Sequence, residues 1–316
     1  MKDGLQHLLN NLSPYDCLLA YHALKFKLEG KFLENPTGFF HRTIGDVDVY
    51  LIVMVRTKQP SYVTLESTGC DIEPEHPELL SLFEECRQAH PMAFDRFTLF
   101  VNRGAIQDSF QAYMGKLPQK YSIYSNPCLL FYMSPLQRKK VMNLNISLLD
   151  GYKFDEANME EDAKVITDTW IHAGPHELEQ TKLKLKYCPS VLVRHGADAV
   201  GFEISSPFGT QNHLFVLEEH RRKGIGSAVE MKLAQECIGL GLATFLSNLL
   251  NSGMKRLWTG RTETFHGHGI TTLMGSLSSQ ILSIMWLNRA AKGQLVAKQY
   301  DKNKKRLNFI YVVDDN

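Results

Sequence analysis

The segment from His213 to Gly241 constrains the fold more than any other part of the sequence. Its residue pattern predicts a strand at 213–217 and a helix at 227–240. The apolar side of that helix is formed by Val229, Leu233, Ala234, Cys237 and Ile238. Between strand and helix lies a basic turn with two glycines, Arg221-Arg222-Lys223-Gly224-Ile225-Gly226. A strand that passes into a helix in this way is typical of a mixed α/β domain.

This turn has the chemistry of a phosphate-binding site. The N-terminus of a helix presents backbone N–H groups without helical acceptors and a partial positive charge. Gly224 and Gly226 let the backbone approach an anion closely, and the three basic residues before them add charge at the rim. The turn is neither a GxxxxGK[ST] loop nor a GxGxxG fingerprint, since position 229 is Val229. The alternative is an ordinary strand-to-helix turn with a solvated basic rim.

The first 140 residues predict a mixed α/β domain. Apolar residues that first alternate and then run continuously predict a strand at 46–56, with which 61–65 can pair. The other elements expected here are a helix at 5–12, a helix at 77–89, a strand at 94–102, a helix at 107–117 and a strand at 121–133.

We expect a domain boundary in the polar, basic segment 134–145, which contains Pro135, and hence domains at 1–140 and 146–316. The turn Gly196-Ala197-Asp198 predicts a hairpin. The elements expected in the second domain, besides the strand and helix around the basic turn, are strands at 152–157, 190–194, 199–205, 245–250 and 307–313 and helices at 160–171, 177–186 and 270–287.

The charge balance argues against two classes of partner. Lys and Arg number 35 and Asp and Glu number 34, so the net charge of +1 provides no global attraction to nucleic acid or to an anionic membrane. The short basic runs at 221–223 and 302–306 do not form a recognised nucleic-acid module. The longest apolar run, Val49–Val55, is far shorter than the roughly 20 residues of a spanning helix. We therefore expect no nucleic-acid or membrane partner, and a monomer.

Cysteine and histidine spacing predicts no metal site. None of the six cysteines lies in a CxxC pair, and we expect reduced, mostly buried thiols. The twelve histidines form no HExxH motif, and His266-Gly267-His268 lacks a third ligand. The first residues show neither a signal peptide nor an Arg-rich presequence, which predicts an intracellular protein.

The basic turn carries a resemblance to a known family. Arg221-x-x-Gly224-x-Gly226 matches the Q/R-x-x-G-x-G/A signature of the GNAT superfamily of N-acetyltransferases. Upstream, the strand that follows Pro189-Ser190, the returning strand Val200-Gly201-Phe202-Glu203 and the strand leading to Glu218 resemble the C-terminal half of glycine N-acyltransferase-like proteins. The specific part of this resemblance covers about 150–243, and the N-terminal domain fits that family's two-domain plan by length and strand order.

The resemblance implies a fold and an activity. The fold would be α/β (α+β), with two acyltransferase-like mixed domains, the C-terminal one having the GNAT fold. The activity would be an acyl-CoA-dependent N-acyltransferase that transfers an acyl group directly to a small amine, such as glycine or another amino acid. Acyl-CoA would be a co-substrate, with no tightly bound cofactor and no metal. Family resemblance points to mitochondria, whereas the absence of a presequence leaves the cytoplasm open.

The resemblance also assigns residues to the CoA site. The turn would hold the pyrophosphate of acyl-CoA, and the backbone of the preceding strand would hold the acyl-pantetheine arm. The residues so assigned are Leu214, Phe215, Val216, Leu217, Arg221, Arg222, Lys223, Gly224, Ile225, Gly226 and Ser227.

The general base is less well defined. Aligned on the glycine turn, the acidic base of the glycine-using members falls on Thr210, and threonine is a poor base. His213 and Glu203 are nearby substitutes, as are Glu218 and Glu219 at the strand–turn junction. Histidine has a suitable reference pKa of about 6.5. Alternatively, His213 is a strand residue that faces a helix.

Residues after 243 depart from the family pattern. The segment 259–269 is rich in Thr, Gly and His, and no tyrosine stands where the acid for the leaving thiolate is expected; Tyr300 and Tyr311 are distant candidates. The alternative function is therefore a catalytically impaired CoA-binding or scaffold protein with an acyltransferase-like fold. A V-shaped separation between 214–217 and 245–250 would favour the enzyme.

Overall fold

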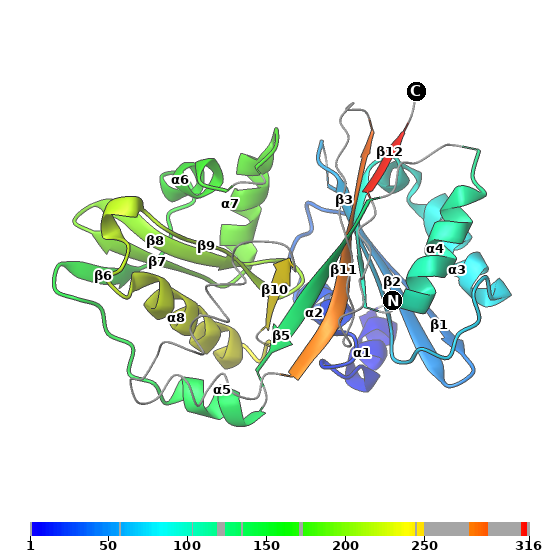
Figure 1. The fold of residues 1–316 in the computed structure, drawn as a ribbon, viewed down its shortest axis with the longest axis horizontal. Coiled ribbons are helices and arrows are strands. Elements are labelled where there is room, and N and C mark those ends of the chain that lie inside the picture. The colour runs from blue at the N-terminus through cyan, green and yellow to red at the C-terminus, as the bar shows by residue number, and fades with distance from the viewer. Residues whose placement is uncertain are drawn as a thin grey trace. The chain divides into compact units, whose positions relative to one another are not determined.

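The computed structural model describes residues 2–56, 58–102, 104–118, 124–133, 135–170, 173–243, 245–249, 278–289 and 311–314 (Figure 1). The chain forms two compact units, each considered by itself below. Unit 1 comprises Met1–Leu129, Asn248–Asn251 and Gln280–Asn316, and unit 2 comprises Leu130–Ser247 and Ser252–Ser279. Each unit combines helices with a mixed sheet, so the protein belongs to the α+β class.

The sheet of unit 1 has the strand order β1-β2-β3-β4-β11-β5, with β12 paired to β11. Its strands are β1 (Thr37–Ile44), β2 (Val47–Met54), β3 (Ser61–Ser67), β4 (Phe97–Val101), β5 (Tyr124–Tyr132), β11 (Ser278–Arg289) and β12 (Tyr311–Asp314). Strands β1, β2 and β3 are antiparallel neighbours, whereas β4 runs parallel to β3. Strand β11 runs antiparallel to β4 and parallel to β12.

Helices cover both faces of this sheet. They are α1 (Lys2–Asn11), α2 (Leu18–Leu28), α3 (Pro77–Ala89) and α4 (Gly104–Gly115), with a short 3₁₀ helix, η1 (Pro91–Phe94). The side chains of Val49, Leu51 and Val53 in β2 join the core cluster that contains Phe83 of α3. The intervening residues of β2 are also buried. Because side chains alternate between the two faces of a strand, β2 is covered on both sides, as expected for a continuous apolar run.

Helix α3 shows why the strongly periodic segments were predictable. Pro77 occupies its first turn, and the side chain of His76 accepts a hydrogen bond from the Glu78 N–H at 3.3 Å. The buried residues follow helical spacing and pack into the core: they are Leu79, Leu82, Phe83 and Cys86. The bounds of α3 confirm the helix predicted at 77–89.

Other expectations for unit 1 need correction. Residues 278–287, predicted as part of a helix at 270–287, form strand β11, and its Trp286 is paired with Thr98 of β4. A short apolar run fits a helix or a strand equally well, and pairing with a neighbouring strand decides between them. Helix α2 and strand β1 were not predicted as elements. Of the two tyrosines considered as acids, Tyr311 begins β12, and Tyr300 lies outside the described residues.

The sheet of unit 2 has the strand order β10-β9-β8-β7-β6. Its strands are β6 (Tyr152–Asp155), β7 (Ser190–His195), β8 (Asp198–Ser205), β9 (Thr210–Val216) and β10 (Phe245–Leu249). Neighbours from β6 to β9 are antiparallel, and β10 is parallel to β9. Its helices are α5 (Pro135–Met142), α6 (Asp162–Asp168), α7 (Glu177–Tyr187), the 3₁₀ helix η2 (Glu218–His220) and α8 (Ile225–Gly239). Helices α6 and α7 lie on one side of this sheet and α8 on the other (Figure 1).

The units differ from the expected domains in two segments. Helix α5 belongs to unit 2, where the side-chain amide of Gln235 in α8 donates to the carbonyls of Val141 and Leu144, each at 2.9 Å. Strand β11 completes its pairing with β4 in unit 1, although the expected C-terminal domain includes it. Long-range pairing of this kind leaves no mark in local composition.

The α8 side of the unit 2 sheet contains a buried carboxyl pair. Glu203 of β8 and Glu230 of α8 are only 1% and 2% exposed. Burial, and then the charge of Glu230, raise the pKa of Glu203 well above its usual value. Nearby Cys237 of α8 is also buried, and burial followed by the charge of Glu203 raises its pKa to about 12. These contacts place Glu203 between the sheet and α8.

The raised pKa of Glu203 predicts a pH-dependent stability. Between its unfolded pKa and its folded pKa, the native state binds more protons than the unfolded state, so the free energy of unfolding falls as pH rises. Glutamine cannot ionise, so we expect Glu203→Gln to raise the free energy of unfolding at pH 8 by about 1–3 kcal/mol. Each kcal/mol should raise Tm by about 2–4 °C. The gain should shrink toward pH 5.

Thermal unfolding of both proteins between pH 5 and pH 8 checks this. The matched control is Glu236→Gln on the exposed side of α8, where Glu236 pairs with Lys232 at 3.2 Å. A Glu203→Gln protein that keeps the wild-type pH dependence of Tm would contradict the expectation.

Candidate functional site

The basic turn connects β9 and η2 to α8 through two residues with left-handed backbone. Arg222 has φ 62° and Gly224 has φ 78°, and Gly224 caps the N-terminus of α8. Only glycine adopts this region without steric cost, which explains its place at the cap. The first helical bond runs from the Ala228 N–H to the Gly224 carbonyl at 3.0 Å. The N–H groups of Ile225, Gly226 and Ser227 therefore precede the helical ladder and form an anion-binding end.

The first turn of α8 lies directly on the sheet. A methyl group added at Gly201 of β8 would come within 2.6 Å of the Ile225 side chain, so the absence of a side chain at 201 permits this approach. At Gly226 an added methyl group would meet only Val216, at 3.6 Å. The helix start is thus fixed against β8, while Gly226 keeps room for a ligand.

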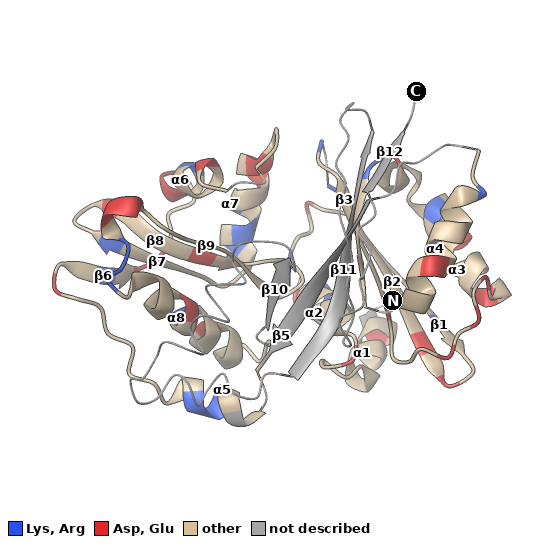
Figure 2. Cartoon of the chain, viewed as in Figure 1, with Lys and Arg blue, Asp and Glu red and all other residues tan. Residues whose placement is uncertain are grey.

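The side chains of the turn have different partners. The Arg221 guanidinium donates from Nε to the Val216 carbonyl at 2.9 Å and lies 5.6 Å from the Phe215 ring. The Lys223 ammonium donates to the Tyr152 hydroxyl of β6 at 2.8 Å. Arg222 is exposed. Figure 2 shows basic and acidic residues side by side at this end of the unit, near β6.

Strand β9 presents one edge toward β10. Its pairing with β10 joins Thr210 to Phe245 and Gln211 to Leu246, at the beginning of both strands. Further along, the Leu217 N–H donates to the Val200 carbonyl at 2.9 Å, and Val216 pairs in register with Gly201. In an antiparallel strand, the backbone N–H and C=O groups of one residue point to one edge and those of the next residue to the other edge. Because the Leu217 N–H points toward β8, the N–H and C=O groups of Val216 point away from β8.

A β-bulge interrupts β9 at the centre of the site. Phe202 pairs with Phe215 and Ile204 with Asn212, so Glu203 lies opposite both His213 and Leu214. His213 takes a left-handed backbone with φ 60°. Such a bulge re-aims side chains and disrupts the ladder locally. The regular strand expected at 213–217 is therefore corrected: the bulge falls on its first two residues.

His213 packs among aromatic side chains on the α6–α7 side of the sheet. Its ring stacks on Trp170 with centroids 5.3 Å apart and meets Phe202 edge-on at 5.5 Å. Its Nε2 lies 3.3 Å from the Thr169 hydroxyl. The Thr169 hydroxyl lies 3.0 Å from the backbone carbonyls of Val165 and Ile166 and donates its proton to one of them. The Thr169 oxygen can then accept a hydrogen bond from His213 Nε2–H. This arrangement favours the tautomer with the proton-accepting lone pair at Nδ1.

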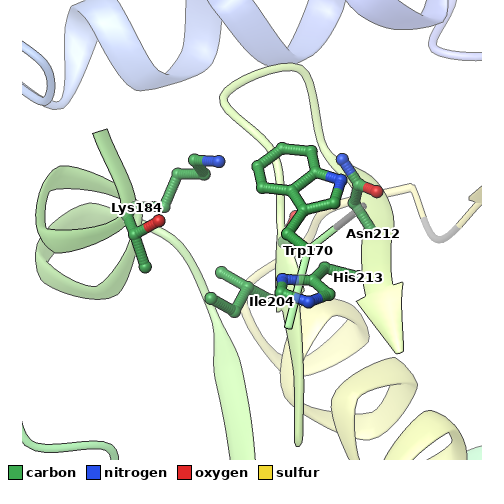
Figure 3. A pocket seen from close by; sticks show the side chains of 7 residues that line it. Trp170, Lys184, Ile204, Asn212 and His213 are labelled. Carbon is green, nitrogen blue, oxygen red and sulfur yellow. The ribbon is translucent and has the colours of Figure 1, made fainter. Parts of the chain in front are cut away.

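A small pocket lies beside this histidine (Figure 3). Its volume of about 10 Å³ is room for about one water molecule. Its lining is formed by Trp170, Thr181, Lys184, Ile204, Ser205, Asn212 and His213. The Lys184 ammonium, directed toward the Trp170 ring at 3.8 Å from its centroid, forms a buried ion pair with Glu177 at 2.9 Å. Sequence reasoning missed Lys184, because a lysine in a charged helix gives no sign that it is buried.

The three catalytic candidates do not come together. Thr210 begins β9, where its hydroxyl hydrogen-bonds to the Ser206 hydroxyl across the β8–β9 turn. Glu203 faces α8, whereas His213 contacts Trp170 on the opposite side of the same sheet. Glu203 is 1% exposed and packed under α8, so it does not line the pocket beside His213. His213 alone lines the pocket.

The described part of the chain shows no cluster of three or more metal-ligating side chains. The loop 266–268 lies outside the described residues. The cysteines described with side chains are in the thiol form, not in disulfides: Cys17, Cys86, Cys188 and Cys237 are buried and Cys70 is exposed. Of the helices in the described ranges, none is both long and apolar enough to cross a membrane.

Among the comparisons with known proteins, a solved structure shares the fold. No protein-family profile matches the sequence, and no curated protein sequence matches it significantly. An X-ray structure of a Drosophila protein has a TM-score of 0.65 and 14% identity, covering 91% of this chain and 96% of that one. At such low identity this likeness shows a shared fold alone.

Two further structures are similar at lower scores. A tandem GNAT protein from the clavulanic acid biosynthesis pathway has a TM-score of 0.46 and 11% identity, over 84% of this chain and 87% of that one. A putative GNAT-family acetyltransferase from Novosphingobium aromaticivorans has a TM-score of 0.46 and 9% identity, over 87% and 98%. We base no conclusion on these two, because their TM-scores are low.

Proposed function

We propose that this protein is an acyl-CoA-dependent N-acyltransferase with a GNAT-like C-terminal half that resembles glycine N-acyltransferases. The observation that carries the proposal is the continuity between the β9 edge and the glycine-capped start of α8. Arg221 donates a hydrogen bond to the Val216 carbonyl at the strand edge, and three residues later Gly224 caps the helix whose first N–H groups belong to Ile225–Ser227. A thioester with a long pantetheine arm and a pyrophosphate needs such a track, with hydrogen-bonding backbone along the arm and amides at the diphosphate.

In this proposal the pyrophosphate binds at the N-terminus of α8 and the pantetheine arm lies along Leu214–Leu217. The thioester carbonyl then reaches the bulge at His213 and Leu214. Backbone N–H groups beside the bulge stabilise the oxyanion that forms when the acceptor nitrogen attacks. The N–C bond forms first, and the C–S bond breaks when the oxyanion collapses. The nitrogen gives up its proton and the leaving thiolate takes one from water, so the products are the N-acyl amine and the CoA thiol.

His213 is the proposed general base. An acceptor amine is largely protonated near neutral pH and must lose its proton for the attack, and imidazole is suited to accept it. Thr169 positions the ring by accepting from Nε2–H, and the proton goes to Nδ1. Nδ1 is covered in this structure, so the acceptor enters when a lining side chain such as Trp170 moves aside.

The proposed acceptor is small, glycine or another amino acid, because the sequence resembles glycine N-acyltransferases. The pocket beside His213 has a volume of about 10 Å³, room for about one water molecule, so even glycine enters only after the lining rearranges. The size of the pocket also supports a second candidate function, binding of acyl-CoA without transfer, and the same experiments separate the two.

The first prediction concerns CoA binding. We expect wild-type protein to bind CoA with Kd below about 1 mM in calorimetric titration, about −4 kcal/mol or better. Gly226→Glu should raise the Kd for CoA about 100-fold or more, which corresponds to about 3 kcal/mol, because the new carboxylate would occupy the position proposed for the diphosphate. The matched control is Gly239→Glu at the other end of α8, where an added side chain meets nothing within 4 Å. Equal binding by both variants would refute the CoA site.

The second prediction concerns His213. We expect His213→Asn, which tolerates the left-handed backbone at this position, to lower kcat about 10²–10⁴-fold. The acidic limb of the pH profile of kcat/KM should disappear, while the Kd for CoA stays within about twofold of wild type. Thiol release from acetyl-CoA with glycine provides the assay. An unchanged pH profile would exclude His213 as the base, and CoA binding without any turnover of small amines would support binding without transfer.

A further inference from the structure

Four side chains from separate segments meet at the rim of the basic turn in unit 2. They are Tyr152 at the start of β6, His195 at the end of β7, His220 in η2 and Lys223 in the turn, and we call them the rim cluster. The Tyr152 ring lies 4.8 Å from the His195 ring and 5.6 Å from the His220 ring. The two imidazoles lie 5.3 Å apart.

The hydrogen bonds of the rim cluster have a defined direction. A lysine ammonium can only donate, so the Tyr152 oxygen accepts from Lys223 at 2.8 Å. The hydroxyl proton is then available to His220 Nδ1, 2.9 Å away. This leaves Nε2–H of His220 and the remaining ammonium protons of Lys223 as donors for a ligand.

Acidic residues lie near the rim cluster without pairing with it. Within the described ranges, no carboxylate forms an ion pair with Lys223 or with either imidazole. The nearest acids by position are Asp150, two residues before Tyr152, Asp198, paired in register with His195, and Glu218 and Glu219 beside His220; all four are exposed. Asp155 of β6 is engaged instead by Arg194, at 2.8 Å.

We propose that the rim cluster binds a phosphate monoester, namely the 3′-phosphate of CoA. The inference rests on the proposed function and deepens it, because it separates this subsite from the diphosphate site at the start of α8. Lys223 directly precedes Gly224, the N-cap of α8. Its ammonium nevertheless binds the Tyr152 hydroxyl, so its charge lies at the rim cluster and not beside the first amides of the helix.

The chemistry of CoA fits this division. Its 3′-phosphate and its diphosphate are attached to the same ribose, so two neighbouring anion sites are needed. A phosphate monoester carries more charge than a diester and accepts several hydrogen bonds, which suits an ammonium beside two imidazoles. The aromatic faces of the cluster are also suited to the adjacent nucleoside.

The test compares CoA with dephospho-CoA, which lacks only the 3′-phosphate, by calorimetric titration of the full chain. We expect wild type to bind CoA about 10-fold more tightly than dephospho-CoA. Lys223→Ala should abolish this preference while changing the affinity for dephospho-CoA by less than about threefold. Tyr152→Phe, which keeps the ring and removes the hydroxyl, should reduce the preference by about threefold.

The control is Lys232→Ala on α8, which removes the same charge from a lysine paired with Glu236. It should leave both affinities and the preference unchanged. Equal binding of the two ligands by wild type would overturn the rim-cluster proposal and leave the CoA site intact. Lys223→Ala weakening both ligands equally would also overturn it, by placing Lys223 at the diphosphate. Failure of wild type to bind either ligand would overturn this proposal and the proposed function together.

Discussion

The candidate site depends on the close contact between Ile225 at the start of α8 and the backbone of β8 at Gly201. An added methyl group at Gly201 would lie 2.6 Å from Ile225, so a larger residue would lift the helix start from the sheet. Because Gly201 pairs with Val216, this contact also places the first amides of α8 beside the edge of β9. The left-handed Gly224 then turns the chain from the strand into the helix. A strand edge and a helix N-terminus can act on one ligand only because this packing brings them together.

The two sides of the unit 2 sheet have different roles. Between the sheet and α8 lie the buried Glu203, Glu230 and Cys237, whose ionisation is opposed by burial. On the other side, His213 stacks on Trp170 beside Lys184. Alternation along β8 puts Phe202 on the histidine side and Glu203 on the helix side. One residue along a strand therefore separates a position beside His213 and its pocket from a position buried under α8.

Much of the fold was predictable from the sequence, because several segments carry strong local signals. The helix at 77–89 has a capping residue, a proline in its first turn and a regular apolar stripe, and the structure shows these bounds. A strand and a helix on either side of the glycine turn were likewise predicted, and the structure has them at Thr210–Val216 and Ile225–Gly239, with an unpredicted bulge at His213. Strand β11 was not, since its apolar run has no period that distinguishes a helix from a strand, and its partner β4 is remote in sequence.

By itself, the sequence determined the strongly periodic helices and strands and the basic, glycine-containing composition of the turn before α8. Glycines, prolines and apolar periodicity act over a few residues, so they can be interpreted without knowing the rest of the fold. The tertiary structure alone decided which candidates share a site. The bulge at His213, the burial of Glu203 under α8 and the meeting of Tyr152 with Lys223 depend on strand register and on helix packing. Those interactions join residues far apart in the chain, and local patterns do not record them.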